Sequence, residues 1–205
     1  MTGGQDTVAL RVPSHPVARA ILQRARIGVI APSANRFGGP SATRAEHVVI
    51  DFGEAVDLIV DGGPSTVGVE STIVDLAHGA PVILRPGAVT REQLERALGM
   101  QVATATDAAV RAPGSLPSHY APRANVELFE DEREARARVE QLSDRGTRAV
   151  LLAGAGDVEK FAHDLYERLR AADRDGAQVI VVALPPEGGL GTALRDRLRR
   201  AAAPR

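Results

Sequence analysis

The sequence predicts an α/β protein in two parts that are joined by a linker. Up to about residue 100, alternating apolar segments typical of strands are mixed with amphipathic helices, and polar residues follow several strands. Residues 101–124 are rich in Ala, Thr, Pro, Gly and Ser and show little periodicity, which is typical of a linker. After the linker, apolar strands alternate with helices, which predicts a parallel sheet covered on both faces.

The composition restricts the classes of function that are open to the chain. Its 205 residues, 44% of them hydrophobic, suit one large or two small globular domains. No apolar run approaches the roughly 20 residues of a membrane span, and the first residues lack the build of a secretory signal. The absence of cysteine excludes disulfides and thiolate chemistry and fits a cytoplasmic protein. No HExxH-like spacing predicts a metal site, and the net charge of −1 argues against bulk electrostatic binding of nucleic acid.

The N-terminal elements begin with a strand and a helix. Residues 7–12 alternate as a half-buried strand would, which places Thr7 and Arg11 on one face. Residues 15–26 form an amphipathic pattern with Pro16 in the first turn, which predicts a helix.

The stretch that follows, residues 27–43, is the one that organises the first part. An apolar strand at 27–30 leads to Ser33-Ala34-Asn35 and to a loop with Gly38, Gly39 and Pro40, whose backbone could approach a ligand closely. Thr43 begins a helix that ends near Phe52, with Glu46 at capping-box spacing, so the loop should end on a helix N-terminus suited to phosphate. The alternative is an ordinary strand–turn–helix connection.

Strands predominate from residue 57 to residue 86. We expect them at 58–60, 69–75 and 81–85, with His78-Gly79 forming a hairpin between the last two. Thr90 and Gln93 have capping-box spacing and predict a short helix that ends at Gly99.

The linker and the last part complete the prediction. Tyr120 in the linker either joins the two domains or covers a site. Gly154-Ala155-Gly156 lacks the third glycine of a dinucleotide motif and has Glu159 in its place, so we expect a tight turn there. The expected strands and helices are 126–129, 131–145, 149–153, 157–172, 179–184 and 190–203.

Five segments, in their order and spacing, resemble a known family: DTVALRVP, APSANRFGGPSAT, DGGPSTVGVESTIVDL, VILRPG and SHYAP. They are similar to the long form of the L-threonylcarbamoyladenylate synthases, in which a YrdC-like catalytic domain precedes a smaller Rossmann-like domain. The final GLGTALRDRLRRAAA is similar to that second domain. The implied fold is the C-terminal half of a YrdC-like twisted mixed-sheet α/β domain (1–100), a linker with SHYAP (101–124) and a small Rossmann-like parallel α/β domain (125–205).

The resemblance implies a nucleotidyltransferase that condenses L-threonine, bicarbonate and ATP into threonylcarbamoyl-AMP and pyrophosphate for threonylcarbamoyladenosine modification of tRNA. Its further partners would be tRNA or the downstream threonylcarbamoyl transferase complex. The positions that resemble ATP-binding residues are Thr7, Asn35, Thr43, Arg85 and Tyr120, the last expected to close over the nucleotide. The positions that resemble threonine-binding residues are Arg11, Ser33 and Ser71.

The chemistry of these residues agrees with the implied roles. Arg11 can hold the amino-acid carboxylate through paired hydrogen bonds, and Arg85 can neutralise phosphate, so we expect both guanidinium groups to face one pocket. No Ser-His-Asp or Cys-His arrangement is evident, so we assign no catalytic nucleophile and expect Mg²⁺ to be held mainly by ATP oxygens. Glu70 and Asp75 are expected to be structural.

The sequence departs from the family at its start. Family members carry a further half-domain with a lysine-x-arginine motif ahead of TGGQDTV, whereas the single lysine here is Lys160. We therefore expect an N-terminally truncated synthase with exposed strand edges and apolar faces, in which the missing half matters for activity. The alternatives are a non-catalytic nucleotide- or RNA-binding fragment and a carbamoyl-transfer maturation factor.

Overall fold

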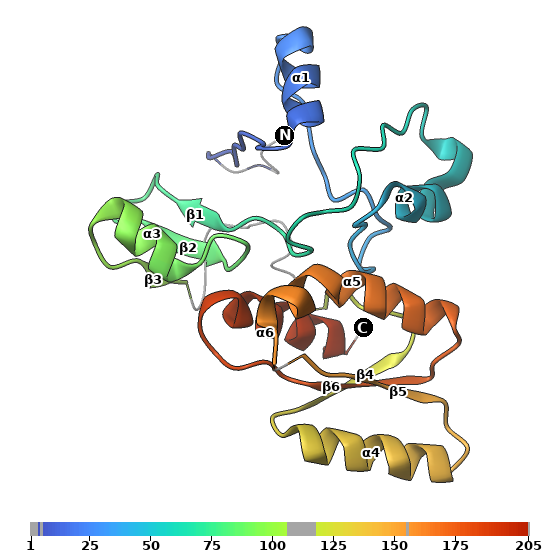
Figure 1. The fold of residues 1–205 in the computed structure, drawn as a ribbon. Helices are drawn as coiled ribbons and strands as arrows, with labels where there is room; N and C mark the ends of the chain where they lie inside the picture. The colour runs from blue at the N-terminus through green and yellow to red at the C-terminus, as the bar shows by residue number, and fades with distance from the viewer. Residues whose placement is uncertain (1–3, 5, 106–117, 155, 205) are drawn as a thin grey trace.

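The computed structural model of the chain describes residue 4 and residues 6–105, 118–154 and 156–204. It contains two three-stranded sheets, one mixed and one parallel, that follow one another along the chain (Figure 1). Helices α5 and α6 lie between the parallel sheet and the N-terminal part, so they form the layer on which that part rests. The predicted α/β class with mixed and parallel sheets is confirmed.

The mixed sheet contains the predicted hairpin, and the second strand of that hairpin is the central strand of the sheet. Strands β1 (Ile73–Asp75) and β2 (Val82–Arg85) pair antiparallel. Strand β3 (Ala103–Thr104), at the start of the segment that we predict to be a linker, pairs parallel with β2. Helix α3 (Arg91–Leu98) begins with the predicted capping box of Thr90 and Gln93 and ends at Gly99, whose φ of 68° is left-handed. The larger part of the predicted linker, residues 106–117, lies outside the described residues.

Three predicted strands, at 7–12, 27–30 and 58–60, are wrong: these segments have no ladder among the described residues. Alternation in a sequence indicates which face of an extended segment is apolar, but a strand also needs a partner backbone, and no described segment supplies one. Their apolar side chains are exposed, with Leu10 at 89% and Val12 at 92%. The expected exposure of apolar faces is therefore confirmed.

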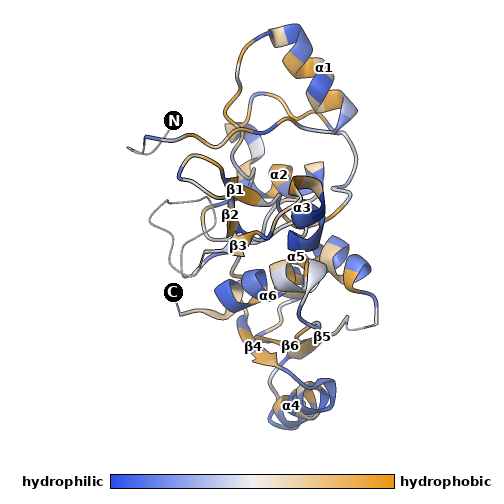
Figure 2. Cartoon of the chain, turned by 90° about the vertical axis from the view of Figure 1, so that its left-hand side faces the viewer, coloured by the Kyte–Doolittle hydropathy of each residue, from blue (hydrophilic) through white to orange (hydrophobic). Residues whose placement is uncertain are grey.

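Helices in this part agree better with the prediction. Helix α1 (Pro16–Ala25) forms as expected, buries none of its residues and stands apart from the two sheets (Figure 2). Helix α2 (Ala45–Phe52) is followed by the 3₁₀ turn η1 (Gly53–Ala55). The predicted capping box at Thr43 is wrong, because the N-cap is Arg44 and its side chain makes no cap bond.

The parallel sheet is close to its prediction. Its strand order is β4 (Asn125–Phe129), β6 (Val179–Ala183) and β5 (Ala149–Leu152), and every residue of β6 is buried. Helix α4 (Glu132–Asp144) covers one face, while α5 (Val158–Arg174) and α6 (Gly189–Ala202) cover the other (Figure 1). The continuous apolar strands therefore have helices on both sides, as such strands require. No helix among the described residues has the length and hydropathy of a membrane span.

The core of the last part extends into the linker. Its larger cluster lies between the sheet and the helices α5 and α6, and Tyr120 belongs to it with only 1% of its surface exposed. The smaller cluster lies under α4. The predicted linker therefore contributes Tyr120 to the core of the C-terminal part.

The capping box of α3 gives a stability prediction. In the variant Thr90→Ala the amide of Gln93 loses its acceptor, so we expect the free energy of unfolding to fall by about 1 kcal/mol. Thr90→Ser keeps the hydroxyl and is the matched control. Urea unfolding followed by circular dichroism measures both, and equal midpoints for the two variants would contradict the role of the hydroxyl.

Candidate functional site

The loop at 38–43 is held by an arginine of helix α5. Arg170 makes a bidentate ion pair with Asp51 of α2, at 3.0 Å and 2.6 Å. The same guanidinium donates to the carbonyl oxygens of Pro40 at 2.6 Å and Ser41 at 3.3 Å. The hydrogen bond from Arg170 holds the pKa of Asp51 below its usual value. Arg170 thus fixes both the loop and α2 to α5.

A half-buried carboxylate makes the second connection between the two parts. Glu70 accepts hydrogen bonds from Ser41 Oγ at 2.6 Å, from the Tyr166 hydroxyl at 2.9 Å and from Arg197 Nε at 2.7 Å. Burial acts to raise the pKa of Glu70, but the charge and hydrogen bonds of Arg197, with the bond from Ser41, lower it overall. Glu70 is therefore held as a carboxylate by residues from three segments of the chain.

Tyr120 lies at the junction between the two parts, beside Tyr166 and Arg197. Its backbone is in a left-handed conformation with φ of 62°. Its ring centroid is 5.6 Å from that of Tyr166, and the guanidinium carbon of Arg197 lies 5.4 Å from it. The neighbouring Ala121 amide donates to the carbonyl of Gly38 at 2.8 Å. Of the two interpretations of Tyr120, the one in which it joins the domains describes what the structure shows.

Arg85, at the end of β2, is buried with 7% of its surface exposed. Its Nη2 and Nε donate to the carbonyl of Ser71 at 2.9 Å and 3.3 Å, which fixes the end of β2 to the segment before β1. Burial lowers the pKa of Arg85, while Tyr120 and Glu70 act in the opposite direction. Arg85, Ser71 and Tyr120 are the predicted site residues that the structure brings together.

Thr43 lies in the loop that Arg170 and Glu70 hold, and Asn35 lies just before that loop. Asn35 donates through Nδ2 to the carbonyl of Gly39 at 3.1 Å, while its buried Oδ1 has no hydrogen-bond partner among the described residues. The Thr43 amide donates to His47 Nδ1 at 3.1 Å, and this bond replaces the expected capping box. Burial lowers the pKa of His47, in agreement with a neutral ring that accepts at Nδ1.

Thr7, Arg11 and Ser33 are not brought into this group. Arg11 and Ser33 are exposed and Thr7 is half-buried, and their side chains make no hydrogen bond or ion pair with other described residues. We expected Arg11 and Arg85 to face one pocket. Among the described residues, no contact brings Arg11 to Arg85. The physical reason is that segment 7–12 has no ladder to fix the direction of its side chains.

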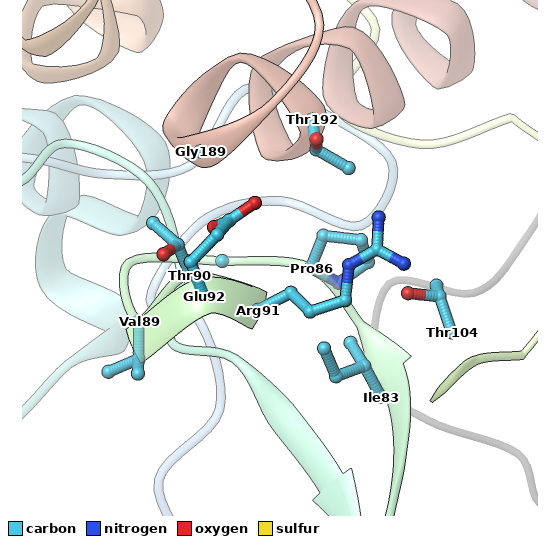
Figure 3. Close-up of a pocket in the computed structure, with 10 residues that line it drawn as sticks. Ile83, Pro86, Val89, Thr90, Arg91, Glu92, Thr104, Gly189 and Thr192 are labelled. Carbon is cyan, nitrogen blue, oxygen red and sulfur yellow. The ribbon is translucent and has the colours of Figure 1, made fainter. Parts of the chain in front are cut away.

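Two cavities among the described residues lie at the starts of helices α3, α5 and α6. One of about 20 Å³ lies between the start of α3 and the start of α6 and has room for about one water molecule (Figure 3). A wider depression of about 770 Å³ lies at the starts of α5 and α6. Asp157, Glu159 and Glu187 line it, and these carboxylates disfavour phosphate. The described residues contain no cluster of three or more His, Asp or Glu side chains suited to a metal ion.

The turn before α5 agrees with its prediction. The Asp157 amide donates to the carbonyl of Gly154 at 3.2 Å, as the expected turn requires, and Ala155 lies outside the described residues. The Asp157 side chain then caps the helix by accepting from the Lys160 amide at 2.8 Å. This carboxylate occupies the helix N-terminus that a dinucleotide would need.

Comparison with known proteins assigns both parts of the chain. A family model described as "Threonylcarbamoyl-AMP synthase, C-terminal domain" matches residues 89–203. A second model, described as "Telomere recombination", matches residues 1–87. The boundary between the two matches falls just after β2, ahead of α3.

Relatives and a solved structure match nearly the whole chain. Threonylcarbamoyl-AMP synthase of Pyrococcus abyssi is 38% identical over 223 residues, and that of Bacillus subtilis is 35% identical over 225 residues. Each alignment covers 98% of this chain and 65% of the relative. The crystal structure of P. abyssi Sua5 complexed with L-threonine has a TM-score of 0.85 and 35% identity, with the same shares covered. The chain therefore spans about two thirds of the length of these relatives.

The close approach of Gly68 to α5 gives a stability prediction. Gly68 has φ of 81°, and an added Cβ would meet the carbonyl oxygens of Ala162 and His163. Gly63 has φ of 87° but open space around it, so Gly63→Ala is a control for backbone strain alone. We expect Gly68→Ala to lower the free energy of unfolding by about 1–3 kcal/mol more than Gly63→Ala, in urea unfolding. Equal losses would contradict the close packing.

The depressed pKa of Glu70 gives a pH prediction. Because the folded pKa lies below the ordinary value of 4.5, the contribution of Glu70 to stability is present above that pH and is lost as the pH falls through the folded pKa. We expect Glu70→Gln to reduce the loss of unfolding free energy between about pH 6 and about pH 3 in urea titrations. Glu140→Gln, on the exposed surface of α4, should keep the wild-type pH dependence. If the free energy of unfolding of Glu70→Gln depended on pH as it does in the wild type, the prediction would be contradicted.

Proposed function

Because the chain belongs to the threonylcarbamoyl-AMP synthase family, we propose that it forms threonylcarbamoyl-AMP and pyrophosphate from L-threonine, bicarbonate and ATP. The observation that carries this proposal is the family match over residues 89–203, together with the likeness of the whole chain to a structure that holds L-threonine. The grouping of Arg85, Ser71 and Tyr120 at one junction supports it. Neither alternative from the sequence has a specific observation in its favour.

The ligand contacts that we propose lie partly at this junction and partly on the N-terminal segments outside it. For ATP we propose Asn35, Thr43, Arg85 and Tyr120, together with Thr7. The unpartnered Oδ1 of Asn35 can accept a hydrogen bond, and the guanidinium of Arg85 can pair with phosphate. For L-threonine we propose Arg11, Ser33 and Ser71, with Arg11 on the carboxylate.

The reaction needs positioning and charge stabilisation rather than a nucleophile from the protein. The amine of L-threonine forms an N–C bond with bicarbonate, and water leaves, which gives a carbamate. A carbamate oxygen then attacks the α-phosphorus of ATP, and the bond from that phosphorus to the bridging oxygen of pyrophosphate breaks. Negative charge develops on the phosphate oxygens in this step, and a buried arginine such as Arg85 stabilises it. Charge-assisted hydrogen bonds of this kind contribute about 1.5–3 kcal/mol each.

We propose that Mg²⁺ enters with ATP and is bound mainly by phosphate oxygens, as Mg²⁺ usually is in nucleotide sites. When bound, it would neutralise phosphate charge together with Arg85. The product would serve threonylcarbamoyladenosine formation on tRNA, through tRNA itself or the transferase complex that consumes threonylcarbamoyl-AMP. A cytoplasmic location follows from these partners.

The test is an assay of pyrophosphate release that depends on both L-threonine and bicarbonate, combined with calorimetric titration of ATP. We expect ATP binding to the wild-type chain, and we expect Arg85→Gln to weaken it by about tenfold or more, because a charged phosphate contact is lost. Arg138→Gln is the matched control, since Arg138 pairs with Glu127 far from the junction. Absence of binding of both ATP and L-threonine, or pyrophosphate release without threonine, would contradict the proposal.

A further inference from the structure

Helix α6 carries two buried arginines that bond to different parts of the protein. Arg195 pairs with Glu130 at 2.6 Å and 3.0 Å and donates to the carbonyl of Pro185 at 2.7 Å, so its bonds stay within the C-terminal domain. Arg197 is fully buried and directs two of its three nitrogens to residues of the N-terminal part. The two side chains differ in what they hold, although they are two positions apart on one helix.

The bonds of Arg197 end on the segments that carry the proposed site residues. Its Nε donates to Glu70 at 2.7 Å, directly before Ser71. Its Nη2 donates to the carbonyl of Pro86 at 2.8 Å, directly after Arg85. Its guanidinium also lies against the ring of Tyr120.

Glu70 extends this hold to the loop. The carboxylate that Arg197 fixes accepts the hydroxyl proton of Ser41 at 2.6 Å, two residues before Thr43. It also accepts from Tyr166 of α5. The Glu70 carboxylate is therefore bonded to the loop and to both helices α5 and α6, and it lies just before the hairpin. Its orientation depends on Arg197.

The directions of these bonds require an arginine. Nε, Nη1 and Nη2 donate to Glu70, Asp196 and the Pro86 carbonyl, which lie in three different directions around one planar group. A lysine could keep the charge but would donate from a single nitrogen. Buried ion pairs often contribute little net stability, and in some proteins their role is to fix one geometry, which is the role that the bonds of Arg197 suit.

We propose that Arg197 is a positioning residue for adenylate formation. Through Glu70 and the Pro86 carbonyl it fixes the spacing of residues 39–43, 70–71 and 85–86, on which ATP and L-threonine bind. This inference rests on the proposed function, and it assigns to the C-terminal domain a part in the geometry of the site.

The test compares Arg197→Met and Arg197→Lys with Arg195→Met in the full chain. Amide hydrogen exchange of the peptides over 38–43 and 70–72 measures the fixation, and calorimetric titration measures the Kd for ATP. We expect Arg197→Met to accelerate exchange in both peptides and to raise the Kd for ATP about tenfold. Arg197→Lys should give an intermediate effect, and Arg195→Met should leave both readouts at the wild-type value, even where its Tm falls.

The possible outcomes separate this inference from the proposed function. Wild-type exchange and wild-type Kd in Arg197→Met, or equal changes in Arg197→Met and Arg195→Met, would overturn the inference while the function stands. If the wild-type chain binds neither ATP nor L-threonine, the proposed function fails. In that case unchanged amide exchange in Arg197→Met would still overturn the claim that Arg197 fixes residues 38–43 and 70–72. If Arg197→Met does not fold, Arg197→Lys decides: faster exchange with the charge retained supports positioning, and wild-type exchange overturns it.

Discussion

The half-buried Glu70 and the fully buried Arg197 contact each other between the two sheets, and the arrangement of the rest depends on this pair. Two charges removed from water must satisfy one another, and removal of one partner of such a pair typically costs about 3–5 kcal/mol. Arg197 has no exposed surface, and the side chain of Glu70 retains 15%. A shift of the N-terminal part on α5 and α6 would therefore separate Glu70 from the buried guanidinium of Arg197, which would keep its bond to Asp196 alone among the carboxylates it contacts.

The parallel sheet provides the support on which this pair can act. Its strand β6 is buried throughout, and α5 and α6 are packed on one face of it. Each helix presents an arginine to the N-terminal part, Arg170 to the loop and Arg197 to Glu70. Side chains on packed helices are held more accurately than side chains on loops. The small domain thereby gives a fixed frame to loops that have few contacts among themselves.

The sequence predicts local features well and long-range pairings poorly. Strands 126–129, 149–153 and 179–184 and the Thr90 cap were predictable because their signals lie within a few residues of each other. Residues 7–12 have the same alternation as a strand, but a ladder depends on a distant backbone that alternation does not identify. Of the site, Arg85, Ser71 and Tyr120 could be selected by motif. Glu70 and Arg197 are 127 residues apart, and the only local sign was an acidic residue in a strand-like segment.

The two tyrosines have a consequence for spectroscopy. The chain contains no tryptophan, and its only tyrosines are Tyr120 and Tyr166. Their rings lie 5.6 Å apart, next to Glu70 and Arg197. All phenolic absorption and emission of this polypeptide therefore originates at one place, where the linker and α5 meet. Absorption and fluorescence in the tyrosine band therefore report on that place without any added label.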